Sequence, residues 1–140
     1  MLYCKRKNST NWQFPQGGID KNEDIFDAAL RELYEEVGIE ENKIKLIKES
    51  DNWYKYDLPK KYKRNSFLWE SFKGQKQKWF LFKLIEETKI DLNNENNPEF
   101  DEFNWVDYWK PLDEIVEFKR KIYKKVLTEL EPAYKSEFSK

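Results

Sequence analysis

The chain has 140 residues, a formal net charge of −1, one cysteine and no histidine. This length predicts one domain over residues 1–140 with a sizeable core. One cysteine excludes an internal disulfide, and the lack of histidine excludes histidine acid–base catalysis, Ser-His nucleophiles and histidine-ligated zinc. No apolar run is long enough to span a membrane and the N-terminus has no signal-peptide pattern, so we expect a cytoplasmic protein without a membrane partner.

The first half of the chain is predicted to contain short strands and one helix. Residues 2–5 are extended, and residues 12–19 (WQFPQGGI) read as a strand that breaks into a Pro/Gly turn. A helix is predicted to end near Val37, because Gly38 suits a helix C-terminus. Its apolar face has helical spacing and consists of Ile25, Ala28, Ala29, Leu33 and Val37. Residues 44–47 alternate with lysines, as in a half-buried strand.

The second half is predicted to contain a long surface loop, two strands and a C-terminal helix. Residues 50–75, rich in aromatic and basic side chains, suggest a functional loop or a broken hairpin. The strongest strand pattern covers residues 77–85, and a short strand is expected at 103–106. Residues 112–130 have apolar positions spaced by three or four and predict a helix. We expect residues 131–140 to form a frayed tail.

Residues 17–39 contain the complete pattern G-x5-E-x7-R-E-U-x-E-E-x-G-U, where U is aliphatic. Glu32, Glu35 and Glu36 occupy neighbouring helical positions, and we expect them to project from one edge of the helix, roughly opposite the apolar face. Carboxylates this close repel one another, and a divalent cation such as Mg²⁺ is their natural partner. Solvated glutamate runs are common, but a chance match to the whole pattern has odds of about one in a million.

Two further residues of this pattern have predicted roles at the metal. Arg31 is expected to orient Glu23 through a bidentate ion pair. The turn at Gly17 allows backbone carbonyls to approach the ion without a side chain in the way.

The pattern is the signature of the Nudix hydrolases, which the chain therefore resembles. The flanking sequences WQFPQGGI, GQKQKWFL, PEFD, FKRKIY and NWYKYDLP are similar to the bacterial RNA pyrophosphohydrolase family, also described as dinucleoside polyphosphate hydrolases and, in some pathogens, as invasion-associated proteins. The resemblance implies the α/β Nudix fold, a mixed β-sheet sandwiched between helices. It also implies Mg²⁺-dependent hydrolysis of a pyrophosphate linkage, which converts the 5′ triphosphate of RNA to a monophosphate and promotes mRNA decay.

The resemblance assigns roles to individual residues. Metal binding falls to the carboxylates and the glycine turn: Glu32, Glu35, Glu36, Glu99 and Gly17. Mn²⁺ or another divalent cation can replace Mg²⁺. Catalytic roles fall to Glu35, Glu99, Glu32 and Arg31. Without histidine the general base must be a carboxylate, and both Glu35 and Glu99 remain candidates.

Substrate-binding roles are expected for residues outside the pattern. Arg6 and Phe118 match family residues that sandwich the first base of the RNA, consistent with the general affinity of guanidinium planes and aromatic rings for bases. Gln75, Lys76 and Lys78 are expected to contact phosphates, with both lysines on one strand face, although such lysines often only confer solubility. Lys119 is expected on a basic rim. Tyr56 is expected to line the cleft, although aromatic residues there suit a core equally well.

The family normally has an additional first strand and a phosphate-binding arginine before residue 2. We therefore expect a fold that lacks this strand, with a late start of the sequence as the favoured explanation.

Three functional hypotheses remain open. The first is an enzyme that acts on the 5′ end of RNA, and the second is an enzyme that acts on a dinucleoside polyphosphate such as diadenosine tetraphosphate. The third is a non-catalytic nucleotide- or RNA-binding module. The oligomeric state is not predicted.

Overall fold

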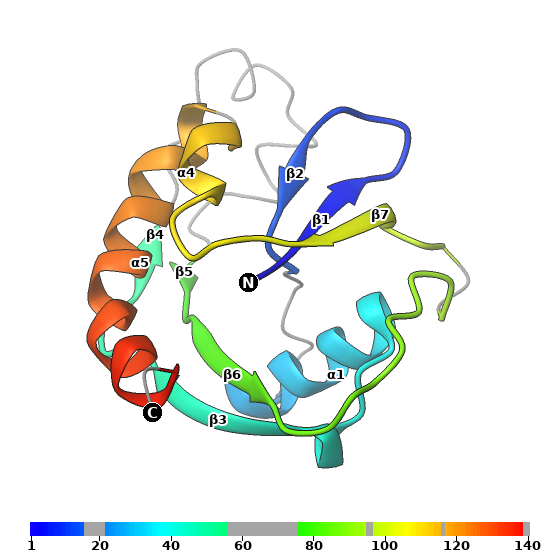
Figure 1. The fold of residues 1–140 in the computed structure, drawn as a ribbon, viewed down its shortest axis with the longest axis horizontal. Helices are drawn as coiled ribbons and strands as arrows, with labels where there is room; N and C mark the ends of the chain where they lie inside the picture. The colour runs from blue at the N-terminus through cyan, green and yellow to red at the C-terminus, as the bar shows by residue number, and fades with distance from the viewer. Residues whose placement is uncertain (16–21, 56–75, 95–96, 116, 139–140) are drawn as a thin grey trace.

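The computed structural model describes residues 1–15, 22–55, 76–94, 97–115 and 117–138, with the backbone alone at positions 76 and 118 (Figure 1). The strands are β1 (Leu2–Arg6), β2 (Trp12–Gln13), β3 (Ile44–Glu49), β4 (Tyr54–Lys55), β5 (Lys76–Gln77), β6 (Phe80–Leu84) and β7 (Phe100–Trp105). The helices are α1 (Ile25–Val37), the short 3-10 helix η1 (Glu41–Lys43), α4 (Pro111–Glu114) and α5 (Glu117–Phe138).

The strands pair in three groups. The largest group has the order β2-β1-β7, and the two others are the pairs β3-β6 and β4-β5. Each of these pairings is antiparallel. The sequence predicted a mixed sheet, but no parallel pairing occurs among the described residues. The β1–β7 ladder has an irregularity between Lys5 and Arg6, which ends the regular part of β1.

Strand β1 lies between two helical layers. Successive side chains of a strand point to opposite faces. Accordingly, Tyr3 packs with Tyr123 and Leu127 of α5, whereas Cys4 packs with Val37 of α1. Figure 1 shows α5 along one side of the molecule and α1 on another. This arrangement confirms the α/β sandwich expected from the sequence.

Helix α1 begins and ends where the sequence predicts. The Asp24 carboxylate accepts hydrogen bonds from the N–H groups of Phe26 (3.0 Å) and Asp27 (3.3 Å), which caps the N-terminus. At the C-terminus, Gly38 has a φ of 73°, and its N–H donates to the Tyr34 carbonyl at 2.9 Å. A Cβ at position 38 would lie 2.8 Å from the Cβ of Asp91, so the close approach of that segment also requires glycine.

Two expectations about element boundaries are wrong. The strand predicted at residues 77–85 is interrupted at Lys78 and Trp79, between β5 and β6. The reason is an anchor, because the N–H of Trp79 donates to the buried Ser50 hydroxyl at 3.0 Å and the Ser50 N–H donates to the Trp79 carbonyl. The helix predicted at residues 112–130 is divided into α4 and α5, which begins at Glu117.

The expected frayed tail is also wrong, since α5 continues to Phe138 with Pro132 inside it. Side chains beyond residue 130 pack on the rest of the molecule. The Tyr134 ring lies 4.5 Å from that of Tyr108, and Glu131 accepts a hydrogen bond from the Trp109 indole at 2.6 Å. These tertiary contacts stabilise a segment whose sequence alone does not favour a helix.

None of the helices that the structure describes combines the length and the hydrophobicity needed to cross a bilayer.

Candidate active site

Arg31 is the centre of an ion-pair network on α1. Its guanidinium forms a bidentate pair with Glu23, with Nε–Oε2 and Nη2–Oε1 distances of 2.9 Å. The same side chain donates through Nη1 to Glu32 Oε1 at 2.8 Å and to Glu35 Oε2 at 3.1 Å. The predicted orientation of Glu23 by Arg31 is therefore confirmed. Arg31 also acts as the cation between two carboxylates that the sequence assigned to a metal.

Glu36 is placed differently from its expected position. Its side chain is only 2% exposed, so it does not project from the outer edge of the helix with Glu32 and Glu35. Position 36 lies beside Val37, which is fully buried under β1. Burial, followed by the negative charge of Glu36, raises the pKa of Cys4 to about 12. The expectation that Glu36 lies roughly opposite the apolar face of the helix is thus wrong, because its side chain is buried next to Val37 of that face.

Glu99 joins the carboxylates of α1 although it lies more than 60 residues away in the sequence. Burial raises the pKa of Glu32; the hydrogen bond and charge of Arg31 oppose this rise, and the charges of Glu35 and Glu99 add to it. The backbone carbonyl of Glu99 accepts the N–H of Lys7 at 2.8 Å, which fixes the loop before β7 against the end of β1. Tertiary structure therefore brings Glu32, Glu35 and Glu99 into one electrostatic cluster.

The chemistry of this cluster suits a hard divalent cation. Carboxylate oxygens are the ligands that Mg²⁺ prefers. Glu99 Oε2 is buried and has no hydrogen-bond partner among the described residues, and such an atom is costly without a cation or a donor. As placed, no three acidic side chains of the described segments are grouped closely enough to ligate one ion. Arg31 accounts for this, because it holds Glu32 and Glu35 in its own hydrogen bonds.

A cationic group on α5 also interacts electrostatically with Glu99. Lys119 of α5 is 9% exposed, and its Nζ donates to Gln13 Oε1 of β2 at 3.0 Å. Burial and the charge of Arg6 lower the pKa of Lys119 to about 8, while Glu99 acts in the opposite direction. The charges of Arg6 and Lys119 thus lie close enough to interact. The sequence predicts that both residues bind the substrate, and a shared binding site requires that they lie close together.

Gln13 is a site residue that the sequence interpretation missed. It is 2% exposed, and its Nε2 is buried without a hydrogen-bond partner in the described part of the chain. The sequence did contain a clue to this role, namely the amide side chain of Gln13 between Trp12 and Phe14 in a buried strand. Such a polar side chain needs a specific hydrogen-bond partner.

Other predicted residues have the following places. Lys78 Nζ donates to the carbonyls of Ser50 (2.8 Å) and Asp51 (3.2 Å) and lies 5.4 Å from the ring centroid of Trp53, so it contacts a different part of the molecule from Lys119. Its phosphate contact stays a prediction. Predicted positions that lie outside the described residues are Gly17, Tyr56 and Gln75, together with the side chains of Lys76 and Phe118.

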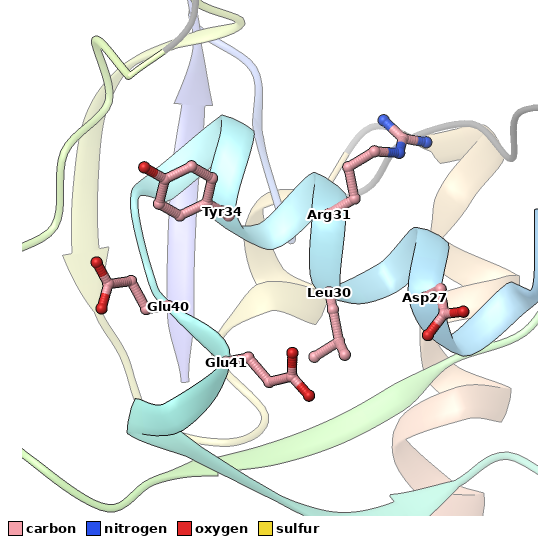
Figure 2. Close-up of a pocket in the computed structure, with 6 residues that line it drawn as sticks. All are labelled: Asp27, Leu30, Arg31, Tyr34, Glu40 and Glu41. Carbon is pink, nitrogen blue, oxygen red and sulfur yellow. The ribbon is translucent and has the colours of Figure 1, made fainter.

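A shallow acidic hollow of about 490 Å³ lies on the outer face of α1, lined by Asp27, Leu30, Arg31, Tyr34, Glu40 and Glu41. Figure 2 shows the Arg31 guanidinium pointing away from the carboxylates of Glu40 and Glu41. The ion pairs of Arg31 are therefore directed elsewhere, and the hollow is separate from the Glu32–Glu99 cluster.

The fold and this cluster define a class of protein. A family model described as the NUDIX domain matches residues 1–126. The chain belongs to the Nudix family.

Named relatives within the family are similar over most of this chain. An RNA pyrophosphohydrolase of Haemophilus ducreyi is 44% identical over 130 residues, which cover 92% of this chain and 66% of that protein. The RNA pyrophosphohydrolase of Actinobacillus pleuropneumoniae is 45% identical, over 92% of this chain and 63% of its own length. That of Francisella tularensis subsp. mediasiatica is 46% identical, over 91% and 82%. The chain spans about two thirds of the length of the first two relatives.

Solved structures share the fold. A C. elegans Ap4A hydrolase in a binary complex aligns with a TM-score of 0.65 at 19% identity, covering 94% of this chain and 86% of that chain. The E. coli dihydroneopterin triphosphate pyrophosphohydrolase aligns with a TM-score of 0.63 at 20% identity, over 91% and 84%. At these identities the likeness concerns the fold alone.

Proposed function

We propose that the chain is a divalent-metal-dependent hydrolase that removes pyrophosphate from the 5′-triphosphate end of RNA and leaves a 5′ monophosphate. The observation that carries this proposal is that Glu99 interacts electrostatically with both Glu32 and Lys119, which links an acidic cluster to a cationic group. A polyphosphate needs both, because a metal must be held by carboxylates and the remaining charge must be neutralised by the protein. Relatives at 44–46% identity that carry the name RNA pyrophosphohydrolase support the substrate.

The carboxylates Glu32, Glu35, Glu36 and Glu99 would hold Mg²⁺ or Mn²⁺, with Glu36 contributing from the most buried position. When bound, the ion supplies neutralisation of charge on the phosphate oxygens. Arg31 would keep its bidentate pair with Glu23 and release Glu32 and Glu35. Its role is then to hold the glutamates in place rather than to contact the substrate.

The reaction exchanges one bond for another. The oxygen of a water molecule forms a bond to phosphorus, the bond from phosphorus to the leaving pyrophosphate oxygen breaks, and the proton of the water passes to a carboxylate. Glu35 and Glu99 are both candidates for that carboxylate. Glu99 Oε2 is buried without a hydrogen-bond partner among the described residues, so it is not engaged by a protein donor as Glu35 is by Arg31.

Arg6 and Lys119 would bind the RNA end. Arg6 is exposed at the end of β1, where a guanidinium plane can stack on a base, and Lys119 lies beside it with Nζ held by Gln13. Phe118 precedes Lys119 on α5 and is proposed as the opposite face of the sandwich. A neutral lysine would bind phosphate poorly, so the lowered pKa of Lys119 makes substrate binding sensitive to pH near neutrality.

A direct assay tests the proposal. Triphosphorylated RNA and diadenosine tetraphosphate are supplied at equal concentration with Mg²⁺, and kcat/KM is measured for each. We expect a higher kcat/KM for the RNA; a markedly higher value for the dinucleotide would assign the same chemistry to a different substrate.

Glu99→Gln and Glu35→Gln variants identify the base, since loss of a general base lowers kcat by about 10²–10⁴-fold. RNA binding without turnover in the wild-type protein would favour a non-catalytic module. Glu86→Gln, whose exposed carboxylate pairs with Lys43, is a suitable control for general effects of removing a carboxylate.

A further inference from the structure

A second concave surface lies between β4 and the outer face of α5, away from the acidic cluster on α1. It encloses about 640 Å³, and its lining includes Trp53, Lys55, Ile122, Lys124, Lys125 and Thr128. Figure 1 shows β4 directly beside α5, and α1 in another part of the molecule. We call this surface the β4–α5 groove.

The charge of the β4–α5 groove is positive. Lys55, Lys124 and Lys125 are exposed and form no ion pair within the described segments. Lys121 lies on the same face of α5, three residues before Lys124 and four before Lys125, so like charges face one another at positions that destabilise a helix. Lys135, further along α5, pairs with Glu131 at 3.7 Å.

The groove lining also contains one acidic side chain, Glu129, whose carboxylate is engaged by other protein groups. Glu129 accepts hydrogen bonds from the Asp51 N–H (2.7 Å), the Asn52 side-chain amide (2.9 Å) and the Tyr54 hydroxyl (2.5 Å). The Asp51 carboxylate accepts one from Lys48 at 3.1 Å. These bonds also fix the loop before β4 onto α5, so the groove has a formed wall.

An exposed aromatic ring completes the groove. Trp53 is 47% exposed, and the Lys78 ammonium lies 5.4 Å from its ring centroid. Lys78 itself is anchored on the carbonyls of Ser50 and Asp51, which holds the cation in place beside the ring. A fixed indole beside several lysines is the arrangement that binds single-stranded nucleic acid, with bases on the ring and phosphates on the cations.

Helix α5 carries both Lys119 of the candidate active site and Lys125 of the groove. Ile122, between them in the sequence, is 8% exposed and packs in the core. At 1.5 Å per residue, the step from Lys119 to Lys125 is about 9 Å along the axis. A strand whose 5′ end lies at the exposed Arg6 would pass over α5 to reach the groove.

We propose that the β4–α5 groove binds the single-stranded body of the RNA substrate downstream of its 5′ end. This inference rests on the proposed function, because it takes RNA as the substrate. Its consequence is that the enzyme gains affinity for longer 5′-unstructured RNA over a triphosphorylated dinucleotide. An acidic polypeptide is the competing occupant, but it would satisfy the lysines without using the Trp53 ring.

The test compares a Lys124→Ala/Lys125→Ala variant with the wild type on two triphosphorylated substrates, a dinucleotide and an unstructured RNA of about 12 nucleotides. Loss of two phosphate contacts is expected to raise KM for the longer RNA about tenfold at 0.15 M salt, because the salt slope falls by about 1.4. The KM for the dinucleotide and both kcat values should not change. Lys135→Ala, on the same helix outside the groove, is the matched control.

Direct binding separates this inference from the proposed activity. Fluorescence anisotropy with 5′-monophosphorylated RNA of the same length should show about tenfold weaker binding for Trp53→Ala and near wild-type binding for Trp53→Phe. Binding of this RNA through the groove, together with no hydrolysis of triphosphorylated RNA by the wild type, would support the inference and refute the activity. Three results would overturn the inference. They are unchanged RNA binding by the lysine and tryptophan variants, an equal rise of KM for the dinucleotide, and displacement of the RNA by polyglutamate as effectively as by RNA.

Discussion

Replacement of Arg31 by alanine tests the ion-pair network at the base of the candidate site. Arg31 is 27% exposed and Glu23 18%, and two hydrogen bonds of 2.9 Å join them. Hydrogen bonds between charged groups contribute about 1.5–3 kcal/mol each, and partial exposure favours the lower end of this range. This sum counts only the two bonds to Glu23 and leaves out the bonds to Glu32 (2.8 Å) and to Glu35, whose side chain is 39% exposed. Arg31→Ala should therefore lower the free energy of unfolding by about 3 kcal/mol.

Thermal unfolding in EDTA measures this loss. For a domain of this size the expected decrease in Tm is about 10 °C. Mg²⁺ should stabilise Arg31→Ala more than it stabilises the wild type, because in the wild type the ion must first displace Arg31 from Glu32 and Glu35. Glu23→Gln should reproduce most of the loss, and the double variant should be far less destabilised than the sum of the two.

Lys43→Ala provides the control, since its pair with Glu86 is exposed and should leave Tm unchanged. An Arg31→Ala protein with a wild-type Tm in EDTA would refute the reasoning. So would additive effects of Arg31→Ala and Glu23→Gln, because the two residues would then act independently. A Mg²⁺ effect on Tm that does not depend on Arg31 would show that the guanidinium does not compete with the ion.

Three further predictions concern pH and stability. The pKa of Lys119 lies at about 8, so KM for triphosphorylated RNA should rise about tenfold between pH 7 and 9 in the wild type and stay constant in Lys119→Arg. The lowered pKa also means that this group favours the folded state more as pH rises above 8. Urea unfolding of the wild type and of Lys119→Met would show this change in stability. Tyr123→Phe removes the acceptor of the buried Phe14 N–H (3.1 Å) and should cost about 1–3 kcal/mol in urea unfolding, with near-UV circular dichroism unchanged. Gly38→Ala should lower Tm, because its φ of 73° and the Asp91 contact leave no room for a side chain; an unchanged Tm would contradict this.

The sequence predicts much of the fold because local chemistry marks the ends of several elements. The Asp24 cap and the Gly38 stop delimit α1 by local hydrogen bonds, so both could be recognised without the rest of the chain. The Arg31–Glu23 pair was equally predictable, since both residues belong to one short motif. The tail beyond residue 130 was not, because its helix depends on Tyr108 and Trp109, which lie about 25 residues earlier.

What the sequence by itself determined is the carboxylate motif and the lack of histidine, from which a carboxylate base is the expectation. Tertiary structure alone decided how those groups are arranged. It buried Glu36 beneath β1, placed Glu99 beside Glu32 and Lys119, and gave Lys119 its partner Gln13 from another strand. The physical reason is that burial and charge proximity depend on residues distant in the chain, whereas motif spacing fixes only neighbours on one helix.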